Sequence, residues 1–358
     1  MNGNCVYLNM RRILPNPLTI LVLVAMAGAA TGLEAQLAPS PDASPVSNAP
    51  PPKPEDDAPV ATLKVNVNLV NLFFTVKDKN GALIPHLTKQ NCSVDEDKTP
   101  QTLKHFVAET NQPLTLGILI DTSGSQQRVL PLEKQFGAQF LERVLRKTDQ
   151  AFVANFDTDV DLLQDFTNSP RELERGLNKA EINAGVSFGS GPVPNQNNKG
   201  TVLYDAVYQA SGEKLGNQTG RKAIIILTDG QDEGSDHKIK EAIAAAQKSN
   251  VIIYGILLAD RGGYGGFGLG YSGDFALKQM SDETGGRMIN VGNNGNKLQA
   301  AFSQIEEELR TQYVASYTPT NEKIDGSYRK IAVECKADQG DKLNVQVRKG
   351  YYALAPED

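Results

Sequence analysis

The chain has 358 residues, 40% of them hydrophobic, which is enough for two domains of ordinary size with buried cores. Its 42 acidic and 36 basic side chains leave a formal net charge of −6. Because a mildly acidic surface repels phosphate backbones, the composition argues against a nucleic-acid partner.

The first segment has the pattern of a targeting signal. Arg11 and Arg12 precede an apolar run over residues 18–30 that ends in small residues. This order is typical of a secretory signal peptide. The alternative is a retained membrane anchor, but about 13 apolar residues fall short of the roughly 20 that span a bilayer. We therefore predict a signal peptide over residues 1–35 and an exported protein that is periplasmic, surface-held or secreted.

Residues 36–61 are rich in proline, serine and alanine, as in Ala49-Pro50-Pro51-Pro52. Such a segment cannot form a packed core, so we predict an extended, disordered linker.

Strand patterns stand at both ends of the remaining chain. Alternating apolar residues over 63–76 predict a strand, and further strands are expected near 92–95 and 102–107. Strand patterns return at 313–317, 329–336 and 342–348. The simplest architecture pairs the two sets, as residues 62–112 and 312–354, into one small β-sandwich module.

Between them, over residues 113–311, strands alternate with amphipathic helices. Near-continuous apolar runs predict strands covered on both faces, at 115–120, 151–156, 223–227 and 251–258. Helical spacing of apolar residues predicts helices at 129–146, 170–178, 204–214, 237–248, 275–284 and 297–310. This order predicts an α/β fold, a Rossmann-like doubly wound and mostly parallel sheet, inserted between the two halves of the β-sandwich.

Cys92 and Cys335 are the cysteines that remain after the predicted cleavage. Each lies in a strand-like alternation that directs it toward an interior. In an oxidising compartment two such thiols tend to form a disulfide. The alternative is a pair of buried free thiols that pack as small hydrophobes.

Three polar segments follow predicted strands or begin predicted helices. Open parallel sheets gather ligand sites at the carboxyl ends of their strands, so these segments are expected to converge. Two carboxylates and three hydroxyls form an all-oxygen set that suits Mg²⁺, and less selectively Mn²⁺ or Ca²⁺. The candidate metal ligands are Asp121, Ser123, Ser125, Thr201 and Asp229.

This donor set also predicts what the ion binds. Asp121 and Asp229 balance the charge of a divalent ion, and the protein groups need not fill an octahedron. Gly124 is expected to let the Asp121–Ser125 turn bend. An open coordination position attracts an acidic group, so the expected partner is a protein that offers Glu or Asp.

Other potential ligands carry weaker signals. Three alternating acids near a strand end form either a secondary cation site or, as we favour, a solvated edge: Asp157, Asp159 and Asp161. Three histidines lack metal-ligand spacing: His86, His105 and His237.

Two polar loops are expected at the same end of the sheet as the metal. Residues 262–271 form a glycine-rich run with three aromatic side chains, Tyr264, Phe267 and Tyr271. These side chains either contact a partner or belong to an unselected flexible loop. Residues 183–199 lead into Thr201 and are expected to form part of the rim.

The segment over residues 113–310 resembles a von Willebrand factor type A domain with its metal-ion-dependent adhesion site. Asp121-Thr122-Ser123-Gly124-Ser125, Thr201 and Asp229 match that family's pattern. The wider chain resembles exported bacterial proteins that carry this domain between β segments, through the sequences at 284–287, 313–319 and 350–352. The resemblance implies that the two aspartates position the ion and its waters while the hydroxyls coordinate it. It further implies that Thr201 switches between direct and water-mediated contact.

Both lines of reasoning predict a non-enzymatic adhesion or assembly module. One alternative is a metal-dependent hydrolase, since an open coordination position also activates water. The sequence offers no evident general base beside the ion and no Gly-x-Ser-x-Gly elbow or phosphate-binding loop. A haloacid-dehalogenase-like phosphatase would also need Asp where Ser123 stands. The other alternative is a surface scaffold whose metal site is vestigial. The oligomeric state has no signal in the sequence.

Overall fold

The computed structural model describes residues 69–108, 112–183, 200–258 and 272–354. The predicted signal peptide and linker lie outside these ranges, as do residues 63–68 of the first predicted strand. The described residues all belong to one compact unit, Val65–Asp358. Within them, no helix has the length and apolar character needed to cross a bilayer.

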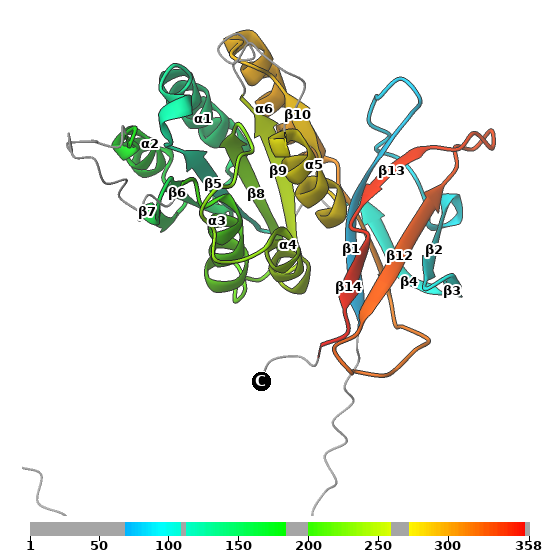
Figure 1. Ribbon diagram of the computed structural model, residues 1–358. Helices are drawn as coiled ribbons and strands as arrows, with labels where there is room; N and C mark the ends of the chain where they lie inside the picture. Colours follow the sequence, from blue (N-terminus) through cyan, green and yellow to red (C-terminus); the bar gives the residue numbers. More distant parts are fainter. Residues whose placement is uncertain (1–68, 109–111, 184–199, 259–271, 355–358) are drawn as a thin grey trace, which may run out of the picture. The chain divides into compact units, whose positions relative to one another are not determined.

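A six-stranded sheet forms the centre of the α/β part, in the order β10-β9-β8-β5-β6-β7 (Figure 1). Neighbouring strands are parallel except for β7, which is antiparallel to β6. The strands are β5 (Leu114–Asp121), β6 (Gln150–Phe156), β7 (Val160–Thr167), β8 (Arg221–Thr228), β9 (Val251–Leu257) and β10 (Met288–Asn290). Every residue of β5, β8 and β9 is buried. The predicted doubly wound, mostly parallel sheet is confirmed.

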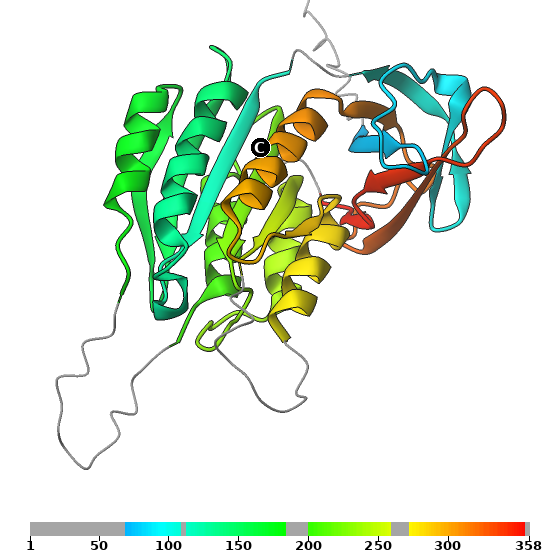
Figure 2. The same cartoon turned by 90° about the horizontal axis from the view of Figure 1, so that it is seen from above.

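Helices cover both faces of this sheet (Figures 1 and 2). One face carries α1 (Leu130–Val144), α2 (Pro170–Lys179) and α6 (Gly295–Arg310). The other carries α3 (Leu203–Gln209), α4 (Ile239–Lys248) and α5 (Ser272–Thr284). The helix predicted at 204–214 becomes a π-helical turn from Ala210 to Lys214. Stacking of Phe140 on Phe302, with ring centroids 4.9 Å apart, joins α1 to α6.

Two four-stranded sheets form the β module, in the orders β13-β1-β11-β4 and β14-β12-β2-β3. Each sheet combines strands that precede β5 with strands that follow α6. The strands are β1 (Val70–Lys77), β2 (Cys92–Glu96), β3 (Thr99–Gln101), β4 (Leu103–Ala108), β11 (Tyr313–Tyr317), β12 (Tyr328–Cys335), β13 (Asn344–Val347) and β14 (Gly350–Tyr352). Their inner faces share one apolar core. The α/β part is therefore an insertion between two halves of a β-sandwich, as the sequence predicted.

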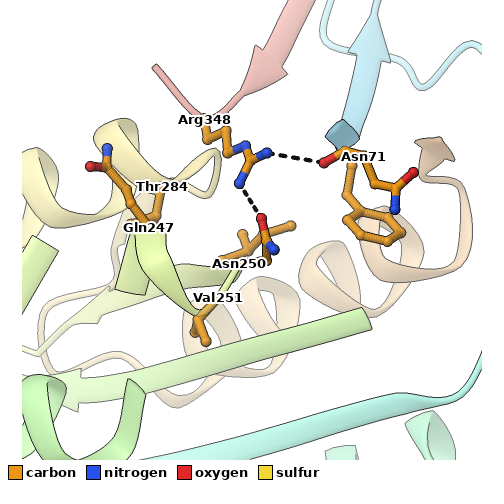
Figure 3. Close-up of a pocket in the computed structure, with 8 residues that line it drawn as sticks. Asn71, Gln247, Asn250, Val251, Thr284 and Arg348 are labelled. Carbon is orange, nitrogen blue, oxygen red and sulfur yellow. Dashed lines mark hydrogen bonds between the residues drawn. The ribbon is translucent and has the colours of Figure 1, made fainter. Parts of the chain in front are cut away.

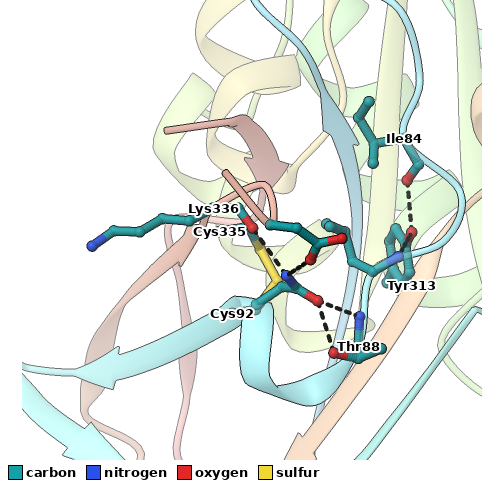
Figure 4. The surroundings of a disulfide bond; sticks show 9 residues. Ile84, Thr88, Cys92, Tyr313, Cys335 and Lys336 are labelled. Carbon is teal, nitrogen blue, oxygen red and sulfur yellow. Dashed lines mark hydrogen bonds between the residues drawn. A yellow bond between two sulfur atoms is a disulfide. The ribbon is translucent and has the colours of Figure 1, made fainter. Parts of the chain in front are cut away.

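A disulfide bond joins Cys92 to Cys335 (Figure 4). The two residues are cross-strand partners of β2 and β12, in an antiparallel register. Their separation in sequence is 243 residues, so the bond closes a loop that contains the whole α/β part. The predicted disulfide is confirmed, and the alternative of two free thiols is wrong. Next to it, Tyr313 donates its hydroxyl to Ile84 O over 2.6 Å.

A buried charge cluster lies inside the β module. Glu96 accepts hydrogen bonds from the hydroxyls of Tyr317 and Tyr351, each over 2.8 Å. Its other carboxylate oxygen pairs with the guanidinium of Arg329 at 3.0 Å. Glu96 and Arg329 are 3% and 1% exposed. Because these residues come from β2, β11, β12 and β14, one acid ties both halves of the module together.

Polar contacts join the β module to the α/β part within the compact unit. Glu308 of α6 pairs with Lys77 of β1 at 2.7 Å. Arg348 donates to the side chain of Asn250 and, over 3.1 Å, to Asn71 O (Figure 3). The cavity beside Arg348 measures about 10 Å³, which is room for about one water molecule. This small cavity lies where the β module meets the α/β part, and it is too small to bind a ligand.

Candidate functional site

Asp121 and Asp229 stand at the same edge of the central sheet. Asp121 is the last residue of β5, and Asp229 directly follows β8. The two strands are parallel neighbours with Ile120 opposite Leu227, so their carboxyl ends meet. Thr228 links the two ends, because its hydroxyl donates to Asp121 Oδ2 over 2.6 Å.

The turn after β5 places three side-chain oxygens in sequence from the interior to the surface. Ser123 N donates to Asp121 Oδ1 over 2.9 Å, and the hydroxyl oxygens of Ser123 and Ser125 are 3.0 Å apart. Asp121 is fully buried and Ser125 is exposed. The bend does not depend on Gly124, contrary to expectation. The φ of Gly124 lies outside the left-handed region, and a Cβ there would meet no atom within 4 Å.

Thr201 lies between the end of β6 and the loop after β8. Its carbonyl accepts from Glu233 N over 3.0 Å, and Val202 N donates to Asp157 O over 2.8 Å. Gly200 allows this approach, because a Cβ there would come within 2.4 Å of the Glu233 Cβ. Thr201 is thus tied through backbone hydrogen bonds to the loop that Asp229 begins. The structure brings Asp121, both serines and the Asp229 loop into contact, and holds Thr201 beside that loop.

The electrostatics of this edge favour a cation. Burial raises the pKa of Asp121 to about 6, hydrogen bonds from Ser123 and Thr228 oppose the rise, and the negative charge of Asp229 adds to it. Two buried carboxylates that repel each other gain free energy when a cation lies between them. The oxygen donors present at this edge therefore fit a hard divalent ion.

Two buried residues that the sequence did not single out follow Ser125 in the chain. Gln126 is fully buried and donates its Nε2 to Ser125 Oγ over 3.3 Å. Glu133, in the first turn of α1, is also fully buried. Burial raises the pKa of Glu133 well above its ordinary value, and the charge of Asp121 raises it further. A signal existed, because Glu133 shares the core-facing helical spacing of Phe140 and an acid on that face is unusual.

The acids at the end of β6 do not form a second cation site. Both carboxylate oxygens of Asp157 have donors, with the Thr122 hydroxyl at 2.8 Å and Asn183 Nδ2 at 3.0 Å. Asp159 and Asp161 are exposed. In the described ranges, no three His, Cys, Asp or Glu side chains are placed to hold one metal ion. Asp157 is instead a structural link between neighbouring loops, and the solvated edge is the better interpretation.

Residues 262–271, with their aromatic side chains, and residues 184–199 lie outside the described residues. The start of α5 lies close to the loop that follows β8. Gly230 has a φ of +82°, and a Cβ there would come within 2.5 Å of Gly273 O. The start of α5 therefore packs directly on the Asp229–Gly230 turn.

A surface hollow in the described part lies away from this edge. It measures about 650 Å³ and lies between the outer surfaces of α1 and α2, where polar residues such as Lys134, Glu142 and Arg171 line it. Small-molecule sites are enclosed and mostly apolar. Because this hollow is open and polar, the edge of the sheet with Asp121 and Asp229 remains the better candidate site.

Comparisons with known proteins agree with this fold. The family model of the von Willebrand factor type A domain matches residues 116–304. Calcium-activated chloride channel regulator 1 from Bos taurus is 25% identical over 248 residues, which are 66% of this chain and 24% of that protein. The chain thus spans about a quarter of the length of this curated relative.

Solved structures with similar folds were also found. BatB from Bacteroides thetaiotaomicron has 17% identity and a TM-score of 0.41, and the match covers 55% of this chain and 99% of that one. Proximal thread matrix protein 1 from the mussel byssus, with a zinc-occupied MIDAS motif, has 15% identity and a TM-score of 0.44. That match covers 60% of this chain and 50% of the mussel chain.

The family match runs from β5 into α6 and includes every candidate ligand. It covers more than half of the chain. Domains of this family act in adhesion and protein–protein interaction, and some carry a metal-ion-dependent adhesion site. The chain belongs to the von Willebrand factor type A domain family.

Proposed function

We propose that this protein is an exported, non-enzymatic binding module that engages an acidic protein partner through a divalent cation, Mg²⁺. Asp121, Ser123, Ser125, Thr201 and Asp229 hold the ion. The observation that carries the proposal is the buried Asp121 carboxylate, which meets a serine pair on one side and the Asp229 turn on the other. The proposed domain limits are 62–112 and 312–354 for the β module and 113–311 for the metal-binding domain.

Charge explains why the site would take a partner's carboxylate. Two aspartates neutralise a divalent ion, and neutral hydroxyls fill further positions without adding charge. An ion with an open position then attracts an outside acid.

Partner capture with and without the ion tests this function. The purified protein is immobilised and exposed to native cell-envelope proteins in Mg²⁺, in EDTA, and in EDTA followed by excess Mg²⁺. We expect specific partners in the first and third conditions only. Mild amidation of the partner's carboxyl groups is expected to abolish capture as well. Equal capture of the same proteins in EDTA would contradict the proposal.

The ion affinity is expected to depend on pH through Asp121. With a pKa of about 6 against an ordinary 3.8, Asp121 in the ion-free protein contributes stability that is fully present below pH 3.8 and is lost as the pH rises through 6. Protons and Mg²⁺ compete for the same carboxylate. The dissociation constant for Mg²⁺ should therefore rise about tenfold for each pH unit below 6 and stay level above pH 7. Calorimetric titrations from pH 5 to 8 measure this, and a flat profile would contradict it.

A further inference from the structure

Glu133 is a buried acid that has no hydrogen-bond partner. Its side chain is fully buried on the core-facing side of α1, and neither carboxylate oxygen is bonded to any described group. A buried carboxyl group without a hydrogen-bond partner is unfavourable whether it is ionised or protonated, so such groups are normally matched with partners. The two unmatched oxygens therefore call for a donor that a bound group supplies.

Gln126, between the serine turn and Glu133 in the chain, shows the same deficit. Its Nε2 contacts Ser125 Oγ, while its buried Oε1 has no partner within the described ranges. Backbone bonds connect the two residues, because Val129 N donates to Gln126 O and Glu133 N donates to Val129 O. Two buried acceptors without partners thus follow the serine turn along one run of backbone hydrogen bonds.

The chemistry of serine ligands explains what these acceptors are for. Ser123 and Ser125 share one hydrogen bond between their hydroxyls. When a hydroxyl oxygen turns a lone pair to a cation, its proton must point away from the ion. Water molecules on the ion likewise direct their protons outward. Acceptors behind the ligands are therefore needed only when the ion is bound, and such partners orient ligands and raise their basicity.

Glu133 does not act as a further direct ligand. No three acids, histidines or cysteines of the described part lie close enough to share an ion, so Glu133 does not join Asp121 and Asp229 around one. Asp121 is nevertheless near enough for its charge to act on Glu133. A buried acid that feels the charge of Asp121 without sharing an ion with it suits the role of a hydrogen-bond partner for the ligands.

We propose that Glu133 is a positioning residue of the metal site, whose carboxylate accepts hydrogen bonds from the hydroxyl or water ligands at the Ser123–Ser125 turn. The inference rests on the proposed metal site and deepens it. Without the ion the Glu133 carboxyl group has no hydrogen-bond partner, which is destabilising whether the group is ionised or protonated. In the ion-bound protein it is hydrogen-bonded and strengthens ion binding. A positioning role therefore predicts that loss of Glu133 weakens ion binding without destabilising the protein in EDTA. A purely structural role predicts lower stability in EDTA as well.

Two variants test the inference, E133Q and E133M. The first keeps the shape without the charge, and the second removes the acceptors and keeps the length. We expect each to weaken Mg²⁺ binding by at least about tenfold, the usual effect of removing such a partner. In EDTA E133M is expected to melt at or above the wild-type temperature, because a buried polar group without a partner is gone. E133Q should melt close to the wild type, because it replaces one unmatched buried polar group by another. Calorimetric titration and thermal melting measure the two effects on the full chain.

E142Q is the matched control, because Glu142 lies on the exposed side of the same helix. Its Mg²⁺ affinity and melting temperature should equal those of the wild type. The inference is overturned if either folded Glu133 variant binds Mg²⁺ as tightly as the wild type. A wild-type protein that binds no Mg²⁺ at all would instead reject the metal site, so the two failures are distinguishable.

Discussion

Replacing Asp121 by alanine is expected to abolish Mg²⁺ binding while the protein stays folded. Asp121 is the buried carboxylate of the site and the residue on which Ser123, Thr228 and Asp229 all act. Removing a residue one layer behind a metal already weakens binding by about 10- to 100-fold, so the loss of a carboxylate ligand should exceed about a hundredfold. Partner capture in Mg²⁺ should fall to the level seen in EDTA.

The folded state should tolerate the change, because burial disfavours the ionised carboxylate. Asp121→Asn provides the sharper variant, since its amide oxygen keeps an acceptor for Ser123 N or the Thr228 hydroxyl. In EDTA it should melt within a few degrees of the wild type, and added Mg²⁺ should not shift its melting temperature. Asp161→Asn, at an exposed acid of β7, is the control and should retain the full Mg²⁺ shift. If D121N kept wild-type affinity, the ion would lie elsewhere.

Replacing Glu96 by alanine is expected to destabilise the β module by about 3–5 kcal/mol, because it leaves a buried charge uncompensated. Arg329 would lose its only carboxylate partner among the described residues, although two backbone carbonyls would still contact its guanidinium. The hydroxyls of Tyr317 and Tyr351 would lose their shared acceptor. Urea unfolding followed by circular dichroism measures the effect, since the chain has no tryptophan.

Two further variants separate burial from simple loss of an ion pair. Glu334→Ala removes an exposed acid of β12 that pairs with Lys342 at 3.0 Å, and we expect no measurable change. The double variant E96L/R329M removes both buried charges and should recover part of the single variant's loss. A single variant as stable as the wild type would show that Glu96 contributes nothing net to the module.

The central sheet, and the edge at which Asp121 and Asp229 meet, were predictable because their signals are local. β5 and β8 are continuous apolar runs, since both of their faces are covered. Asp121 and Asp229 come where those runs end, and parallel strands in one sheet end at one edge. The helices were predictable for the same reason, because apolar residues at helical spacing mark the face that packs on the sheet.

β7 was not predicted, because an edge strand carries a weak pattern. β7 has a neighbouring strand on one side only, and its residues are half-buried or exposed throughout. Asp161, Gln164 and Asp165 interrupt the alternation, and the pairing with β6 shifts register twice. β10 and β14, of three residues each, are too short to give a pattern at all.

Residue types and their order along the chain were enough to predict the alternation of strands and helices, the insertion in the β module and the oxygen donors of the candidate site. Tertiary packing decided the rest. It set Ile120 opposite Leu227, paired Cys92 with Cys335, and brought Glu96 to Arg329 across 233 residues. It also buried Glu133 without a partner. The reason is that a local pattern reports which side of a segment is apolar, whereas the partner of a buried polar group depends on how distant segments align.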